Sequence, residues 1–61
     1  VEVGTRGTAE TDLRPAGHAV FPQGSIDVVS EGDWIRQGSL IEVSAIDGVR
    51  VVVVPVSETG A

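Results

Sequence analysis

The chain has 61 residues and a formal net charge of −5, with no cysteine and no lysine, and these totals exclude several classes of protein. A chain of this length makes one small domain, which buries only about 60% of the surface exposed by its unfolded chain. Without cysteine there is no disulfide framework and no thiolate zinc site. An acidic surface repels phosphate, so we do not expect nucleic acid as a partner. No apolar run approaches the roughly 20 residues that a membrane-spanning helix needs.

The first thirteen residues alternate between apolar or small side chains and polar ones, which predicts one long, half-buried strand. Gly4 and Gly7 have no side chain to pack and permit the strand to bend, as strands do around a small barrel. The small residues Gly7 and Ala9 also predict that another strand approaches closely here.

Two shorter strands are predicted next, with a turn before each. Pro15 and Gly17 suit positions i+1 and i+3 of a type I turn, and a second strand over 18–21 follows. A further turn over 22–24 leads to a third strand over 25–31. No window shows an apolar period of 3.6 residues, so we expect no helix.

Asp47 and Gly48 lie between two β-branched runs and predict a hairpin of strands over 39–46 and 49–56. Asp-Gly suits a two-residue type I′ turn, because both central positions need positive φ. This register places four apolar residues on one core face: Ile41, Val43, Val52 and Val54. The opposite, outer face would carry Leu40, Ile46, Val49, Val51 and Val53.

Five short strands must protect their edges, and closure into a barrel does this most economically. We therefore predict an all-β domain, a small five-stranded OB-fold β-barrel over 1–56, with a flexible C-terminal tail over 57–61. Strands 1 to 3 would form a meander that the final hairpin closes. The usual helix between strands 3 and 4 would be absent, because only 32–38 are available there. A small SH3-like barrel remains the alternative.

Several segments resemble those of a known family, the NfeD-type soluble domains. Residues 4–17 resemble the family's opening pattern G-x-x-G-x-A-x-T-x-L-R-P-x-G. Residues 26–32 resemble its D-V-x-S-E-G segment, 34–38 its aromatic-I-x-x-G, and 41–55 its closing hairpin. The similarity covers nearly the whole chain in consistent order, and the L-R-P-x-G turn followed by S-E-G is its most specific part.

The resemblance implies an OB-fold barrel at the cytoplasmic C-terminus of a membrane protein. Family members partner with stomatin- or flotillin-like proteins and are implicated in membrane quality control, and longer relatives carry a ClpP-like serine protease domain. The family's barrel is not itself catalytic, and the resemblance transfers no functional residue. Because the chain starts with Val1 rather than Met and opens into strand-like sequence, we expect membrane attachment through segments that precede it.

The residues themselves indicate no enzyme, metal or cofactor chemistry. His18 is the one histidine and has no Ser or Cys in a nucleophile motif beside it. Asp27, Glu31 and Asp33 lack the alternating spacing and central glycine of a calcium loop. Residues 30–41 resemble a run of biotinyl and lipoyl domains, but those domains attach their cofactor to a lysine, which this chain lacks.

The apolar outer face of the hairpin and Trp34 are the candidates for partner binding. Contiguous exposed valines favour aggregation unless something covers them. That cover could be the chain's own termini or loops, a second copy, or a partner protein. Trp34 either closes one end of the barrel, with its indole N–H reaching a carbonyl, or anchors an interface. The predicted partner-binding residues are Trp34, Val49, Val51 and Val53.

Our hypothesis from the sequence is a non-catalytic protein interaction domain on the cytoplasmic side of a membrane, binding a stomatin- or flotillin-like partner in membrane protein quality control. The alternative is an accessory domain of a membrane-bound ClpP-like serine protease whose catalytic part is absent here. A third reading is a self-assembling structural barrel, which would show weak self-association.

Overall fold

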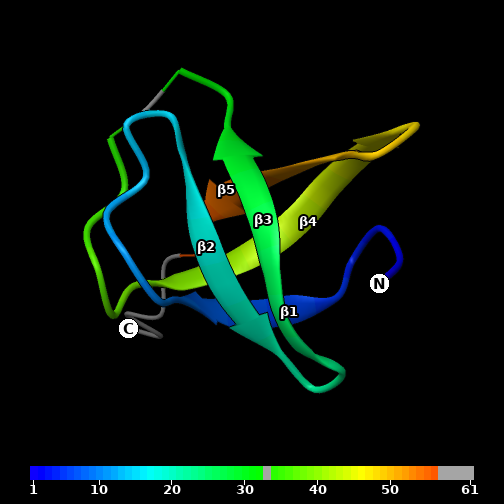
Figure 1. Ribbon diagram of the computed structural model, residues 1–61, viewed down its shortest axis with the longest axis horizontal. Coiled ribbons are helices and arrows are strands. Elements are labelled where there is room, and N and C mark those ends of the chain that lie inside the picture. The colour runs from blue at the N-terminus through cyan, green and yellow to red at the C-terminus, as the bar shows by residue number, and fades with distance from the viewer. Residues whose placement is uncertain (33, 57–61) are drawn as a thin grey trace.

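The computed structural model describes residues 1–32 and 34–56, and within them the chain forms five strands and no helix. The predicted tail over 57–61 lies outside the described residues. Figure 1 shows the strands curled around one another. Their bounds are β1 (Arg6–Ala9), β2 (Ala16–Phe21), β3 (Gly24–Ser30), β4 (Leu40–Asp47) and β5 (Arg50–Pro55).

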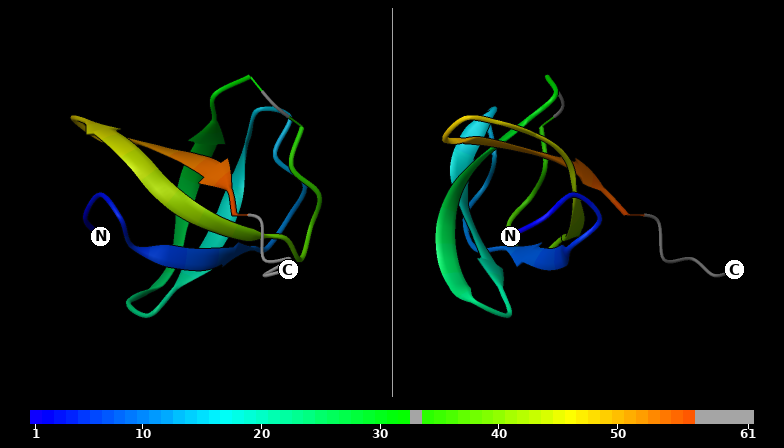
Figure 2. Two further views of the ribbon diagram at one scale, coloured as in Figure 1. Left: turned by 180° about the vertical axis from the view of Figure 1, so that it is seen from behind. Right: turned by 90° about the vertical axis from the view of Figure 1, so that its right-hand side faces the viewer.

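The strands form a closed barrel in the order β1-β2-β3-β5-β4. β1, β2 and β3 are an antiparallel meander, and β4 and β5 are an antiparallel hairpin. The hairpin closes the barrel because β4 pairs antiparallel with β1 and β5 pairs parallel with β3. Figure 2 shows this closure from behind and from the side. This confirms the prediction of an all-β, five-stranded barrel of OB type.

The predicted long first strand is wrong, because turns interrupt it at both ends. The N–H of Thr5 donates to the carbonyl of Glu2 at 3.0 Å, and Gly4 in that turn has a φ of +95°. After β1 the chain leaves the ladder, and Leu13 returns as an isolated bridge to Ile35. Alternation alone could not reveal these breaks, because small and polar residues suit loops as well as strands.

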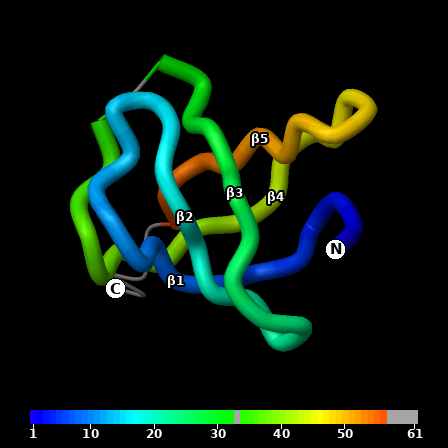
Figure 3. Tube along the Cα trace, in the orientation of Figure 1, coloured from blue at the N-terminus to red at the C-terminus, as the bar shows by residue number. Residues whose placement is uncertain are grey.

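β2 starts two residues earlier than predicted, directly after Pro15. Ala16 pairs with Val29, and the carbonyl of Pro15 accepts a hydrogen bond from the N–H of Ser30 at 2.9 Å. The β2–β3 ladder therefore continues up to the turn, where the sequence had indicated only a loop. Figure 3 traces β2 and β3 as a long, curved pair across one side of the barrel.

The core draws on every strand and on the Leu13–Ile35 bridge, which fills one end of the barrel. Full burial of one aliphatic side chain stabilises a fold by about 1.5–3 kcal/mol. The buried apolar residues are Ala9, Leu13, Ala19, Phe21, Val28, Ile35, Ile41, Val43 and Val53.

The register of the β4–β5 hairpin differs from the predicted one. Asp47 pairs with Arg50, so the two loop residues are Gly48 and Val49 rather than Asp47 and Gly48. Gly48 has a φ of +65°, and within residues 1–32 and 34–56 only glycines have positive φ. A glycine with positive φ at the first central position is typical of a type II′ turn, which suits a hairpin as well as type I′ does.

A β-bulge at Ser44 then shifts the register a second time, between Val43 and Ala45. The Ser44 hydroxyl lies 3.3 Å from the carbonyl of Val52 and 3.0 Å from a carboxylate oxygen of Glu31, so it can donate to either. These contacts hold the extra residue in place.

The bulge exchanges the faces of β5, because it moves the register by one residue, whereas the change of loop moves it by two. Val53 is completely buried opposite Val43, whereas Val52 and Val54 are only partly buried on the other face. The prediction that Ile41 and Val43 face the core is confirmed, but Val53 does not lie on an outer face.

Candidate partner-binding groove

A groove of about 430 Å³ lies between the β2–β3 ladder and the tip of the β4–β5 hairpin. From the outward face of the ladder it is lined by Ala16, His18, Asp27 and Val29. From the hairpin it is lined by Val49, Arg50 and Val51.

The groove exists because β3 and β5 separate soon after they meet. Their parallel ladder consists of Val29 with Val52 and Ser30 with Val53. The ladder stops before Val28 and Val51, and these two residues line the groove instead of pairing with each other. Figure 1 shows the hairpin leaving the barrel beside β3, which opens the wedge between them.

The hairpin tip gives the groove an exposed apolar rim. Val49 is 100% exposed, because it occupies the second loop position and its side chain contacts nothing else. Ile46, one step back on β4, is 40% exposed. Val51 pairs with Ile46 across the hairpin and packs partly against the core, so it lies between the exposed rim and the barrel interior.

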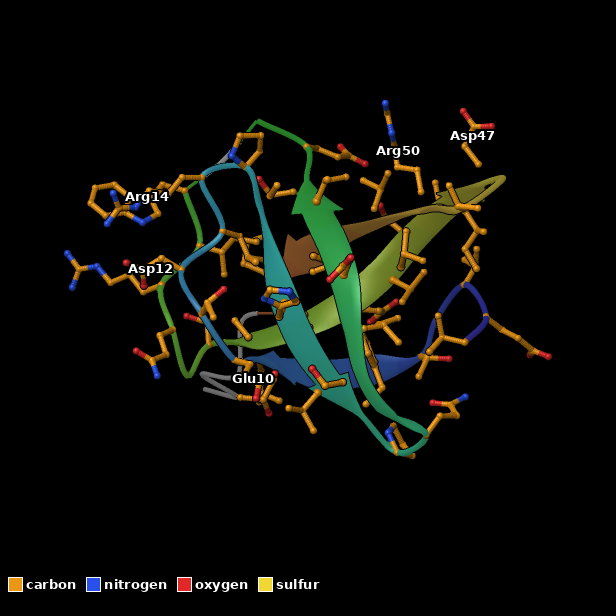
Figure 4. The ribbon with its side chains drawn as sticks, in the orientation of Figure 1. Glu10, Asp12, Arg14, Asp47 and Arg50 are labelled. Atoms are coloured by element: carbon orange, nitrogen blue, oxygen red, sulfur yellow. The ribbon has the colours of Figure 1, made fainter. Side chains whose placement is uncertain are left out.

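Charged side chains stand around this apolar rim. The Nε2 atom of His18 lies 2.9 Å from a carboxylate oxygen of Asp27, and both side chains are mostly exposed. Figure 4 shows Asp47 and Arg50 at the end of the hairpin. Neither of these two side chains forms an ion pair with another described residue.

Trp34 lies elsewhere, on the surface at the far side of the barrel. Trp34 is 62% exposed, so the interpretation of this residue as a plug over the barrel end is wrong. The Arg14 guanidinium lies 5.0 Å from the centre of the indole ring, and Arg14 also pairs with Asp12 at 3.2 Å. Figure 4 shows Arg14 and Asp12 well away from Asp47 and Arg50, so Trp34 does not share the groove.

Asp12 connects Arg14 to the loop that contains Gln37, and its carboxylate makes this surface sensitive to pH. Its carboxylate accepts the backbone N–H of Gln37 at 2.8 Å. That bond first, and the Arg14 hydrogen bond second, hold the pKa of Asp12 below its ordinary value of 3.8. Because the folded pKa is depressed, the contribution of Asp12 to stability is present above the unfolded pKa and is lost as the pH falls through the folded one.

We expect a ¹³C NMR titration of the Asp12 carboxyl to give a midpoint below 3.8 in the folded domain. Arg14→Ala should raise that pKa, and Arg36→Ala should raise it less, because Arg36 acts only through its charge. Equal responses to the two substitutions would contradict the assigned hydrogen bond from Arg14.

The structure thus divides the four residues predicted to bind a partner. Val49 and Val51 line the groove, Trp34 belongs to a separate surface, and Val53 is in the core. Sequence reasoning missed the contributions of His18, Asp27, Val29 and Arg50 to the groove. The signal available for them was the fold class itself, because OB barrels bind ligands on the β2–β3 face beside the β4–β5 loop.

Among residues 1–32 and 34–56, no three His, Asp or Glu side chains gather as a group that could hold a metal ion. Asp33, considered above as a cation ligand, lies outside these residues. The same part of the chain contains no helix that could cross a membrane.

Comparison with known proteins supports both the fold and the kind of site. No curated protein matches the chain. The solved structure of the C-terminal domain of stomatin operon partner protein 1510-C from Pyrococcus horikoshii matches with a TM-score of 0.84 and 24% identity, over 92% of this chain and 89% of that one. At that identity the likeness establishes the shared fold. The family described as NfeD-like C-terminal, partner-binding domain matches residues 2–55, and the chain therefore belongs to this family.

Proposed function

We propose that this domain binds a stomatin-like membrane protein through the groove between the β2–β3 ladder and the β4–β5 hairpin. The family is described as partner-binding, and the structurally similar Pyrococcus protein is named as a stomatin operon partner. The observation that carries the choice of surface is Val49, a fully exposed aliphatic residue at the rim of an apolar groove.

Physical reasons support this surface over the rest of the barrel. Burying an exposed aliphatic side chain on binding contributes about 1.5–3 kcal/mol at most, and Val49 loses no existing contact when it does so. The groove beside it is concave, which a partner side chain needs in order to be desolvated from several directions.

In this proposal the domain is held near the membrane by its partner and by membrane attachment elsewhere in the protein, and not by direct contact with lipid. The net charge of −5 disfavours direct contact with an anionic lipid surface. In this proposal the domain has no catalytic role of its own, lies on the cytoplasmic side and binds a stomatin-like protein in membrane quality control.

The test is a ¹H–¹⁵N titration of the domain with the soluble region of a stomatin-like protein from the same organism. Saturable shifts at Val29, Val49 and Val51 would support the groove. Shifts of the Trp34 indole in the same experiment would show that the partner also reaches the Arg14–Trp34 surface. Saturable shifts confined to other residues would overturn the choice of groove, and no shifts would overturn the partner.

Val49→Ser should weaken this binding about tenfold, equivalent to about 1.4 kcal/mol, because it removes the apolar rim. The free energy of unfolding should change by less than about 0.5 kcal/mol, since the side chain makes no contact in the free domain. Val3→Ser is the matched control, because Val3 is 61% exposed but does not line the groove. Equal losses of affinity in the two variants would argue against a specific role for Val49.

A further inference from the structure

We infer that the groove takes an extended, apolar segment carrying a basic side chain, which adds as a strand to the open edge of β3. This inference rests on the proposed function and specifies the chemistry of the partner segment. The structural observation is a stretch of strand edge that lies beside the apolar groove without a strand next to it.

β3 has two edges, and only one of them is fully used. Along one edge, every residue from Gly24 to Val29 pairs with β2. Along the other, β3 pairs with β5 only at Val29 and Ser30. In residues 1–32 and 34–56, no loop or turn backbone bonds to the remaining stretch over 24–28. The groove lies at this edge, where Asp27 and Val28 line it.

β2 shows how the same barrel treats a similar gap elsewhere. Its ladder with β1 is also short, consisting of Thr8 with Val20 and Ala9 with Ala19. Beyond it, however, a loop covers the edge of β2: Glu10 and Thr11 donate their N–H groups to the carbonyl of His18, at 2.9 and 3.3 Å. The Thr11 hydroxyl accepts the N–H of His18 at 3.1 Å. The corresponding edge of β3 has no such loop among the described residues.

An uncovered edge of this kind is a template for another extended chain. Peptides that add a strand gain main-chain hydrogen bonds, and alternate side chains enter neighbouring pockets. A segment lying on β3 would direct alternate side chains into the groove, against Val29, Val49 and Val51. Apolar side chains fit that lining.

The charges around the groove favour a basic side chain on the segment. The Asp27 side chain is 89% exposed, and its ion-pair partner among the described residues is a histidine, His18, which is charged only when protonated. Asp47 adds a second carboxylate at the hairpin end, against the one cation of Arg50. Together with the net charge of −5, these carboxylates attract a cation and disfavour a second copy of the domain.

The probe is a capped six-residue peptide that alternates lysine and valine, titrated into the ¹⁵N-labelled domain. We expect saturable shifts over 24–28 and at Val49 to Val51, with a dissociation constant below about 1 mM. Intermolecular NOEs between backbone protons of the peptide and those of β3 should accompany the shifts. Methylating the peptide nitrogens that face β3 removes the donors but keeps the side chains, and should weaken binding at least tenfold.

The charge requirement has its own test. Asp27→Asn should weaken binding of the lysine peptide about fivefold, whereas Glu42→Gln should change it less than twofold. Glu42→Gln is the matched control. It also removes one negative charge, but Glu42 pairs with Arg6 and does not line the groove. A peptide with glutamate in place of lysine should bind at least tenfold more weakly.

Each contrary result overturns a specific part of this inference. Equal binding of the methylated peptide would overturn strand addition, and equal binding of the glutamate peptide would overturn the basic requirement. Groove shifts that appear on concentrating the domain alone would assign the groove to a second copy. If no peptide shifts the groove but the stomatin-like protein does, the inference fails while the proposed function stands.

Discussion

A Gly7→Ala variant is expected to lose about 3 kcal/mol of its free energy of unfolding. A domain of this size has a total stability of roughly 3–9 kcal/mol, so the variant would populate unfolded chain at moderate temperature. Urea titration followed by circular dichroism measures the loss. A loss below about 1 kcal/mol would contradict the packing described for β1.

The large effect follows from what surrounds Gly7. A Cβ atom built there would overlap the backbone carbonyl oxygen of Val20 and lie 2.6 Å from Cδ1 of Phe21. The carbonyl belongs to β2, which pairs with β1 directly beside this point, so it cannot move without opening the ladder. The Phe21 ring is buried in the core, so a clash with it is not relieved by moving into solvent.

Gly48→Ala is the matched control for the loss of a glycine. Gly48 has a φ of +65°, but a Cβ built there meets no atom within 4 Å. Its cost should come from backbone conformation alone, at about 1 kcal/mol. A Gly48 variant as unstable as the Gly7 variant would show that chain stiffness, and not overlap, sets the effect.

The close approach at Gly7 was predictable from the sequence, and so was most of the architecture. Period-two alternation, Pro-Gly turns and the final β-branched hairpin are local signals, and edge protection then leaves few arrangements for five short strands. The small residue Gly7 allows another strand to approach closely, and the carbonyl of Val20 in β2 does so.

The candidate site was less predictable, because it depends on where strands part rather than on where they form. Gly48 can belong to either of two two-residue hairpin loops, Asp47-Gly48 or Gly48-Val49. The sequence favours the first because Asp-Gly is a common turn pair, but the structure has the second. The bulge at Ser44 depends on the contacts of its hydroxyl with Val52 and Glu31, which no local pattern shows. Val49 was therefore identified as exposed for a partly wrong reason, and Val53 was assigned to the wrong face.

The groove residues on β2 and β3 needed the tertiary fold before they could be recognised. His18 and Asp27 lie in different strands and meet only because the β2–β3 ladder pairs them. Val29 is an apolar residue on the outward face of β3, and the hairpin tip opposite it accounts for an apolar side chain there.

Val53→Ala is expected to cost about 2–3 kcal/mol of the free energy of unfolding, and Val54→Ala less than about 1 kcal/mol. Val53 is completely buried opposite Val43, so the substitution removes two buried methyl groups, at about 0.8 kcal/mol each, and leaves a cavity. Val54 lies one position along on the other face and is only partly buried.

The two variants differ by position alone, because the same atoms are removed from neighbouring residues of one strand. The register expected from an Asp47-Gly48 turn places Val54 in the core and Val53 outside, and so predicts the reverse order of stabilities. A Gly48-Val49 loop moves the register by two residues and leaves the faces unchanged, so urea titrations of the two variants test the Ser44 bulge, which moves it by one. Since the same register points Val51 inward and leaves Val49 at the tip, a larger loss for Val54→Ala would also remove the groove as it is described.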